Sequence, residues 1–174
     1  FLSAGTMLLQ YFGDDSQVAA SLIWTFGDLG KAGWQEIRLL TLLLFPISGY
    51  LLTRAWCLNS LQWGTDVART MGVATGRLRL IGLLLVCLLV AVITAFWGII
   101  AFIGLMAPHL IRPLIGTDQR FLLPSSALCG ALLLLIADCI SRTVLAPLVI
   151  PVGIVTSFAG APLFLYLLLK RRSS

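Results

Sequence analysis

His109 is the one residue whose type alone invites catalytic chemistry, because an imidazole can transfer protons near neutral pH. Hydrolysis at such a residue also requires a nucleophile beside it and a group that orients it. The candidate nucleophiles Ser125, Ser126 and Ser141 lie on other segments, and no G-x-S-x-G elbow occurs. The sequence therefore predicts no catalytic residue, and a hydrolase is disfavoured.

A second chemical candidate is the stretch GDLGK at 27–31, which superficially resembles a phosphate-binding loop. Such a loop requires the spacing G-x-x-x-x-G-K-[ST] between a strand and a helix. Here Ala32 occupies the position of the hydroxyl that would bind magnesium, and no strand is predicted before it. We therefore expect this chain to hydrolyse no nucleotide itself.

The cysteines offer neither a metal centre nor a disulfide framework. They are scattered singly, without a C-x-x-C pair, at Cys57, Cys87, Cys129 and Cys139. Inside an apolar helix, a free cysteine behaves as a small hydrophobic side chain. The sequence predicts no metal site and no cofactor.

The composition identifies the solvent in which these residues must work. Of 174 residues, 59% are hydrophobic and 11% are charged, whereas soluble domains carry about 25% charged residues. So little polar surface cannot cover a water-soluble globule, and we predict a membrane protein. The net charge of +5 comes from basic residues between apolar runs and at the C-terminus. Because no basic helix is interleaved with aromatics, nucleic-acid binding is not expected.

The apolar runs predict an all-α, polytopic membrane protein with about five full spans. A spanning helix needs about 20 mostly apolar residues. Residues 1–12 are too short to cross and are expected to be the remainder of a truncated helix. The longer runs, the first of them interrupted by Pro46 and Gly49, are residues 39–57, 80–108, 121–140 and 150–169.

The run that begins at Leu80 is predicted to turn back near Trp97 and Gly98 and to cross twice by Leu114. As one helix it would be about 43 Å long, whereas the hydrocarbon core is about 30 Å thick. Basic loops favour the cytoplasmic side, and two crossings bring the three basic segments to that side. Nine of twelve basic residues then lie inside: Arg54, Arg69, Arg77, Arg79, Arg112, Arg120, Lys170, Arg171 and Arg172. Five of seven acidic residues lie outside: Asp14, Asp15, Asp28, Glu36 and Asp138.

Residues 13–38 form an extracytoplasmic segment that is too polar to span. Ile23, Trp24, Phe26 and Trp34 suit a short helix at the membrane interface, where tryptophan is favoured.

Several motifs follow one another in order over nearly the whole chain. They are WTFGDL at 24–29, GTDVARTMGV at 64–73, RLR at 77–79, GLMAPHLIR at 104–112, GTDQR at 116–120, LP at 123–124, ADCISR at 137–142, PVGIV at 151–155 and GAPLF at 160–164. Together they resemble the FecCD family, the membrane permease subunits of ABC importers for iron–siderophore complexes, haem and cobalamin. An ordered set of motifs is far more specific than any single one.

The resemblance implies a ten-helix permease of the type II importers, of which this chain would form the C-terminal half, beginning inside the fifth helix. Such a permease lies in the cytoplasmic (inner) membrane of a prokaryote and is surrounded by membrane lipid. Its implied partners are a second permease subunit (expected to be a second copy), cytoplasmic ABC ATPase subunits and an extracytoplasmic substrate-binding protein. The cargo would be a metal chelate.

The loop at 59–79 is predicted to contact the ATPase. Its residues can form one or two short amphipathic helices that are broken at Gly72, since glycine tolerates a bend. The resemblance places the coupling helices here, with Met71 where the family usually has leucine. The residues assigned to coupling are Asp66, Ala68, Arg69, Gly72, Arg77 and Arg79. The alternative is a solvated cytoplasmic turn whose arginines only enforce topology.

Arg142 follows the fourth apolar run on the outer side, four residues after Asp138. One interpretation is an i,i+4 ion pair that anchors a helix end. The other, implied by the matching family position, is that Arg142 docks an acidic residue of the binding protein. A guanidinium suits that role because it stays charged and can bind a carboxylate through two hydrogen bonds.

The last span carries small residues at Gly153, Ser157 and Ala161, a spacing that lets helices approach closely in lipid. Gly160 and Pro162 favour a kink, because proline removes a backbone hydrogen bond. In the family this helix helps to line the pathway at the dimer interface. An apolar or small lining suits a permease that lets a bulky chelate pass without binding it tightly.

Some positions depart from the family pattern. Val149 stands where the family commonly has glutamate, so an acidic contact there is in doubt. Asp28 and Gln119 replace a common serine and histidine. A secondary, ion-coupled transporter is the alternative function, but it would need ionisable groups near the membrane midplane, and the charged residues cluster at predicted span ends.

The segment around His109 is therefore predicted to be a structural corner on the ATPase side. Pro108 and the nearby charges are expected to end a short returning helix, with Arg112, Asp118 and Arg120 in the following loop. Whether this corner touches the ATPase or only braces the loop at 59–79 is left open.

Overall fold

The computed structural model describes residues 2–144 and 149–172, and every regular element within these ranges is helical. The α-helices are α1 (Leu2–Phe12), α2 (Asp15–Thr25), α3 (Trp34–Thr53), α4 (Ala55–Ser60), α5 (Thr65–Thr70), α6 (Thr75–Trp97), α7 (Ile103–Ile115), α8 (Gln119–Thr143) and α9 (Val152–Arg172). Two short 3₁₀ helices are η1 (Leu29–Lys31) and η2 (Leu61–Trp63). The predicted all-α, polytopic architecture is confirmed.

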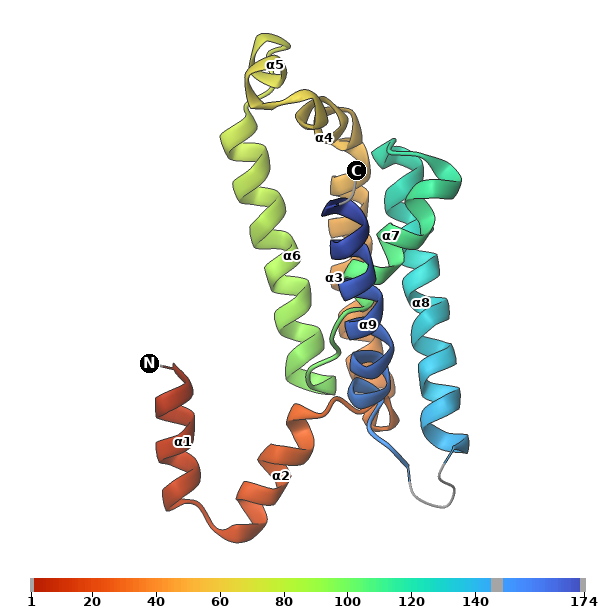
Figure 1. The fold of residues 1–174 in the computed structure, drawn as a ribbon. Coiled ribbons are helices and arrows are strands. Elements are labelled where there is room, and N and C mark those ends of the chain that lie inside the picture. The colour runs from red at the N-terminus through yellow and green to blue at the C-terminus, as the bar shows by residue number, and fades with distance from the viewer. Residues whose placement is uncertain (1, 145–148, 173–174) are drawn as a thin grey trace.

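The long helices run up and down through a bundle with two distinct ends (Figure 1). We call the end that carries residues 54–74 and 116–118 the α5 end, and the end that carries residues 26–33, 98 and 149–151 the η1 end. α3 runs toward the α5 end, α6 returns, α7 runs back, α8 returns and α9 runs toward the α5 end again. Among the described helices, α3, α6 and α8 are long and apolar enough to cross a membrane, and α7 and part of α9 are shorter apolar helices.

The turn near Trp97 and Gly98 is confirmed. α6 ends at Trp97, Gly98 has a φ of 76°, and no regular helix forms again until Ile103. α7 has 13 residues, so it is about 20 Å long and covers only part of the way back. The non-helical segment at 98–102 covers the rest (Figure 1). The basic loops therefore do lie at one end of the bundle.

The predicted effect of the prolines was wrong. α3 continues through Pro46 and Gly49 without interruption, and α7 continues through Pro108 and Pro113 to Ile115. A proline removes one backbone hydrogen bond, and the surrounding helix can absorb that loss within a membrane protein. The end of α7 is instead set by Gly116, whose φ of 90° stops the helix.

The first full span also differs in its limits. α3 begins at Trp34, so residues 34–38 of the predicted interfacial segment belong to this helix. It ends at Thr53, and Cys57 lies in α4, beyond a break at Arg54. Arg77 and Arg79 of the predicted loop likewise lie in the first turns of α6.

Close backbone crossings hold the η1 end together. Asp28 donates its N–H to the Trp97 carbonyl at 2.9 Å, and Trp24 donates its indole N–H to the Ala95 carbonyl at 3.3 Å. A Cβ on Gly153 would overlap the Phe26 carbonyl and lie 2.7 Å from the Ile99 carbonyl. α9 can start at this depth only because position 153 has no side chain.

Candidate functional site

The α5 end is crossed by a continuous element, residues 54–74, that contains α4, η2 and α5 (Figure 1). α5 contacts both η2 and α4. Ala55 of α4 and Ala68 of α5 are each 0% exposed. Because these small side chains are fully covered, the short helices pack as one compact body. We call this body the end element.

α5 closes on a turn that requires glycine at position 72. The Gly72 N–H donates to the Arg69 carbonyl at 2.9 Å, and the Val73 N–H donates to the Ala68 carbonyl at 3.0 Å. This pair of bonds is the Schellman arrangement, in which the residue after the helix takes the left-handed conformation. Gly72 does so with a φ of 80°. The predicted break at Gly72 is confirmed as a helix-ending turn.

The predicted coupling residues divide into exposed charges and a buried support. Asp66 and Arg69 lie 3.9 Å apart on α5, with side chains 94% and 69% exposed. Ala68 faces the interior of the end element. Arg69 also donates from Nε to the Thr75 hydroxyl at 3.3 Å, and with Arg79 it lines a hollow of about 280 Å³. An exposed charged surface on a buried support suits contact with another protein.

A larger cleft of about 550 Å³ lies between the end of α3 and the start of α6. Arg54 and Arg77 line it together with Tyr50, Met71 and Leu78, and none of its lining residues is acidic. The Arg54 guanidinium lies 5.8 Å from the centre of the Tyr50 ring. Arg77 lines this cleft, whereas Arg79 lines the smaller hollow, so the two arginines lie on different sides of α6. The six predicted coupling residues therefore do not form one patch.

The corner between α7 and α8 is hydrogen-bonded to the end element. Asn59 donates from Nδ2 to Asp118 Oδ1 at 2.7 Å, and its Oδ1 accepts from the Gln119 N–H at 2.8 Å. Gln62 donates from Nε2 to the Thr117 carbonyl at 2.8 Å. We call Asn59, Gln62 and residues 117–119 the polar clamp. The corner therefore braces the end element, which is one of the two roles that the sequence left open.

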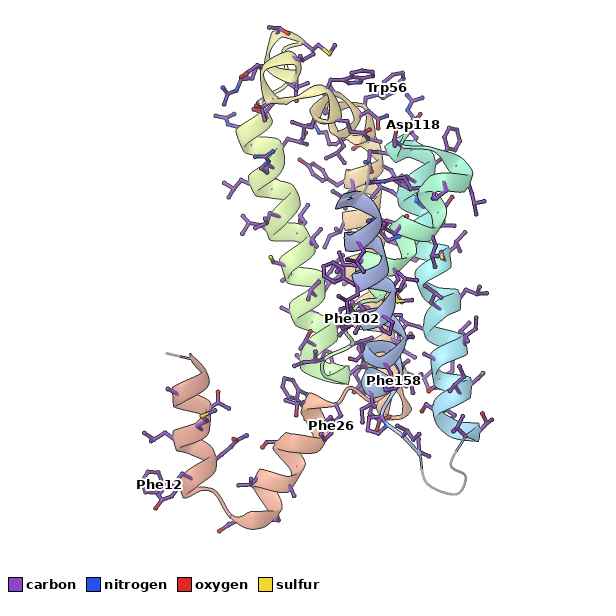
Figure 2. The ribbon with its side chains drawn as sticks, viewed as in Figure 1. Phe12, Phe26, Trp56, Phe102, Asp118 and Phe158 are labelled. Atoms are coloured by element: carbon purple, nitrogen blue, oxygen red, sulfur yellow. The ribbon has the colours of Figure 1, made fainter. Side chains whose placement is uncertain are left out.

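An aromatic contact and a carboxylate strengthen this junction. The Arg120 guanidinium lies 3.5 Å from the centre of the Trp56 ring, a cation–π contact between α8 and α4. Figure 2 shows Trp56 and Asp118 close together at the α5 end. The hydrogen bond from Asn59, followed by that from the Arg120 backbone N–H, lowers the pKa of the Asp118 carboxyl. The carboxylate thus stays ionised at physiological pH and accepts charge-assisted hydrogen bonds.

At the η1 end, Arg142 pairs with Asp138 through a 2.8 Å contact from Nε to Oδ2. The Arg142 side chain remains 51% exposed. A Cβ on Gly30 would lie 3.9 Å from its Nη2, so η1 borders the same spot. Among the residues that the structure describes, Asp138 binds the Nε of this guanidinium, whose two Nη groups carry further N–H donors of the kind that bind a carboxylate.

The buried part of α9 includes only some of the residues predicted to pack. Gly153, Thr156 and Gly160 are buried, Ser157 is half-buried, and Ala161 and Pro162 are exposed. A Cβ on Gly160 would overlap the side chain of Phe102, the residue just before α7, which has an unusual φ of 67°. α7 and α9 are therefore in contact at the middle of the bundle (Figure 2). α9 runs through Pro162 as one helix.

His109 is exposed on α7, and among the described residues no group of three His, Cys, Asp or Glu side chains comes together. The residues of the candidate site that sequence reasoning did not single out are Trp56, Asn59 and Gln62. Their partners lie more than 50 residues away along the chain. The one available signal was Asn59, a polar residue at the boundary of an apolar run.

Comparison with known proteins supports the family resemblance that the sequence motifs indicate. The profile of the FecCD transport family matches residues 1–170. A protein of Methanocaldococcus jannaschii named as an ABC transporter permease, MJ0087, is 56% identical over 168 residues, which is 97% of this chain and 48% of that protein. The hemin transport system permease HmuU of Yersinia pestis is 43% identical over 169 residues, covering 97% of this chain and 51% of its own length.

A solved structure described as an inward-facing conformation of a metal-chelate type ABC transporter has a TM-score of 0.89 and 34% identity. The match covers 97% of this chain and 56% of the solved one. The chain thus spans about half the length of the curated relatives it matches. The chain belongs to the FecCD transport family.

Proposed function

We propose that this chain forms part of the permease subunit of an ABC importer that carries a metal chelate across the cytoplasmic membrane of a prokaryote. The family match supports the transport role. The observation that carries the proposal is the end element, a compact charged body braced across one end of a bundle of apolar helices. Such a body suits the transfer of force from a separate protein.

In this proposal the α5 end is cytoplasmic and contacts an ABC ATPase, which carries out ATP hydrolysis on its own subunit. The exposed side chains Asp66 and Arg69 would form the contact, with Ala68 as their support. Gly72 shapes the turn, and Arg77 and Arg79 border the two hollows beside α6. The basic residues of this end agree with a cytoplasmic orientation.

The η1 end would face outward, where Arg142 would bind an acidic residue of a substrate-binding protein. The permease would pair with a second permease subunit, and α9 would line the pathway with Ser157, Ala161 and Pro162. The buried Gly153 and Gly160 would let α9 pack closely on Phe26 and Phe102 of the same chain. Relatives are named for the import of hemin, Fe(3+)-citrate and vitamin B12. A metal chelate of the kind that these relatives import is the proposed cargo.

Charge reversal at Arg69 tests the contact with the ATPase. In Arg69→Glu the exposed cation of α5 becomes an anion beside Asp66, so the partner should meet repulsion where it met attraction. We expect the amount of ATPase that co-purifies with the tagged permease to fall at least about tenfold, a change of roughly 1.4 kcal/mol.

Arg38→Glu is the matched control, because it makes the same charge change on an exposed residue at the opposite end of the bundle. It should retain the ATPase like the wild type. Equal retention by both variants and the wild type would contradict the assignment of α5 to the ATPase.

A further inference from the structure

The polar clamp connects the end element to the helix pair α7–α8 by side chains rather than by the chain itself. Asn59 uses both ends of its amide, donating to Asp118 and accepting from Gln119 at 2.7 and 2.8 Å. An amide held at both ends is fixed in orientation as well as in distance. Gln62 adds a third bond at 2.8 Å, to the carbonyl of Thr117.

The covalent connections of the end element are bends, in contrast to the clamp. It leaves α3 at the non-helical residue Arg54 and enters α6 through the turn at Gly72. The chain changes direction at both joints, so the end element is a separate body and not a continuation of α3 or α6. The clamp, together with the Trp56–Arg120 contact, adds bonds between α4–η2 and the start of α8, and α4 packs directly on α8.

The helices on the far side of the clamp reach the predicted pathway. α7 and α8 pack along each other, and both contact α9. Phe102 at the start of α7 presses on Gly160 of α9, where not even a Cβ would fit. A continuous set of packed groups therefore runs from α5 through the clamp to α9.

Resting on the proposed function, we propose that the polar clamp is the joint through which movement of the end element, driven by the ATPase, reaches α7, α8 and the pathway. Asn59 and Asp118 are its positioning residues. They touch neither nucleotide nor cargo, and they act by keeping the end element and the α7–α8 corner in one rigid unit.

An exchange of the two side chain types provides the test. Asn59→Asp places a second carboxylate where a donor now lies 2.7 Å from Asp118, so the bond is replaced by repulsion. Asp118→Asn alone is milder, since its amide oxygen can still accept from Asn59 and Arg120. The double variant restores the bond between the two side chains, because the new carboxylate at 59 accepts from Gln119 and from the new amide at 118. In the wild type Asp118 Oδ1 also accepts from the Arg120 N–H, so the amide at 118 must turn its oxygen toward Arg120 to keep that bond.

The measurement is the number of cargo molecules imported per ATP hydrolysed, in proteoliposomes that contain the permease, the ATPase and the binding protein. We expect Asn59→Asp to lower this ratio about tenfold with little change in the amount of bound ATPase. The double variant should return to within about twofold of the wild type. Gln35→Glu, the same change of amide to acid at an exposed site away from the α5 end, should leave the ratio unchanged.

A purely structural role would lower protein yield and ATPase binding together with transport, and the ratio would stay constant. A wild-type ratio in Asn59→Asp, or a double variant as impaired as the single one, would overturn the joint. Failure of the wild type itself to import cargo with ATP would overturn the proposed function, and the coupling role with it.

Discussion

Gly72→Val is expected to separate ATP hydrolysis from transport. Gly72 holds the left-handed conformation at a φ of 80° that ends α5, and an added Cβ would meet nothing within 4 Å. The penalty is therefore conformational rather than steric crowding: a non-glycine residue in this region costs about 1–2 kcal/mol, and a β-branched one is especially ill-suited. The turn should open, and α5 should no longer be presented in a fixed direction to the ATPase.

A change of 1–2 kcal/mol shifts an equilibrium roughly 5- to 30-fold, and we expect cargo import per ATP to fall in that range. The permease should still insert, because the apolar helices are untouched. Gly82→Val is the matched control, since Gly82 lies inside α6 with open space around it and borders neither hollow. Normal transport by Gly72→Val, or an equal loss in Gly82→Val, would contradict the role of this turn.

Arg142→Glu is expected to abolish tight binding of the substrate-binding protein while leaving the permease folded. The Arg142–Asp138 pair is partly exposed, with side chains 51% and 23% accessible, and helix pairs of this spacing contribute only about 0.3–0.5 kcal/mol. Its loss should therefore be tolerated. At an interface, however, charge reversal replaces attraction with repulsion, and we expect the dissociation constant for the binding protein to rise at least about tenfold, or roughly 1.4 kcal/mol.

Two further variants distinguish docking from helix anchoring. Arg142→Lys keeps the charge but loses the forked geometry, so binding should weaken by less than in the charge reversal. Asp138→Asn removes the partner within the chain and should have a small effect if Asp138 only orients the arginine. Unchanged binding by Arg142→Glu, measured with the permease in nanodiscs, would assign the pair to helix anchoring alone.

Much of the topology was predictable because the membrane imposes a length. Residues 80–108 were too long for one crossing, and the distribution of arginines required a second one, so the turn at Gly98 was found without any contact information. The break at Gly72 was predictable for a similar local reason, since glycine favours the conformation that such a turn requires.

The contacts that define the candidate site were not predictable in this way. Asn59 and Asp118 are 59 residues apart, and nothing in either sequence neighbourhood indicates the other. The prolines led to a wrong prediction because their local effect on a helix was given too much weight. Pro46 and Pro108 weaken a helix locally, but the surrounding turns and the packing of the bundle keep α3 and α7 continuous. Local preference was overruled by tertiary structure.

Uptake by reconstituted proteoliposomes tests the central claim most directly. The permease that contains this chain would be reconstituted with its partner ATPase and binding protein, and supplied with labelled iron chelates, haem and cobalamin. An importer should accumulate one of these cargoes only when both the binding protein and ATP are present, with no ion gradient required. Uptake driven by a proton or sodium gradient without ATP would contradict this account and favour an ion-coupled carrier.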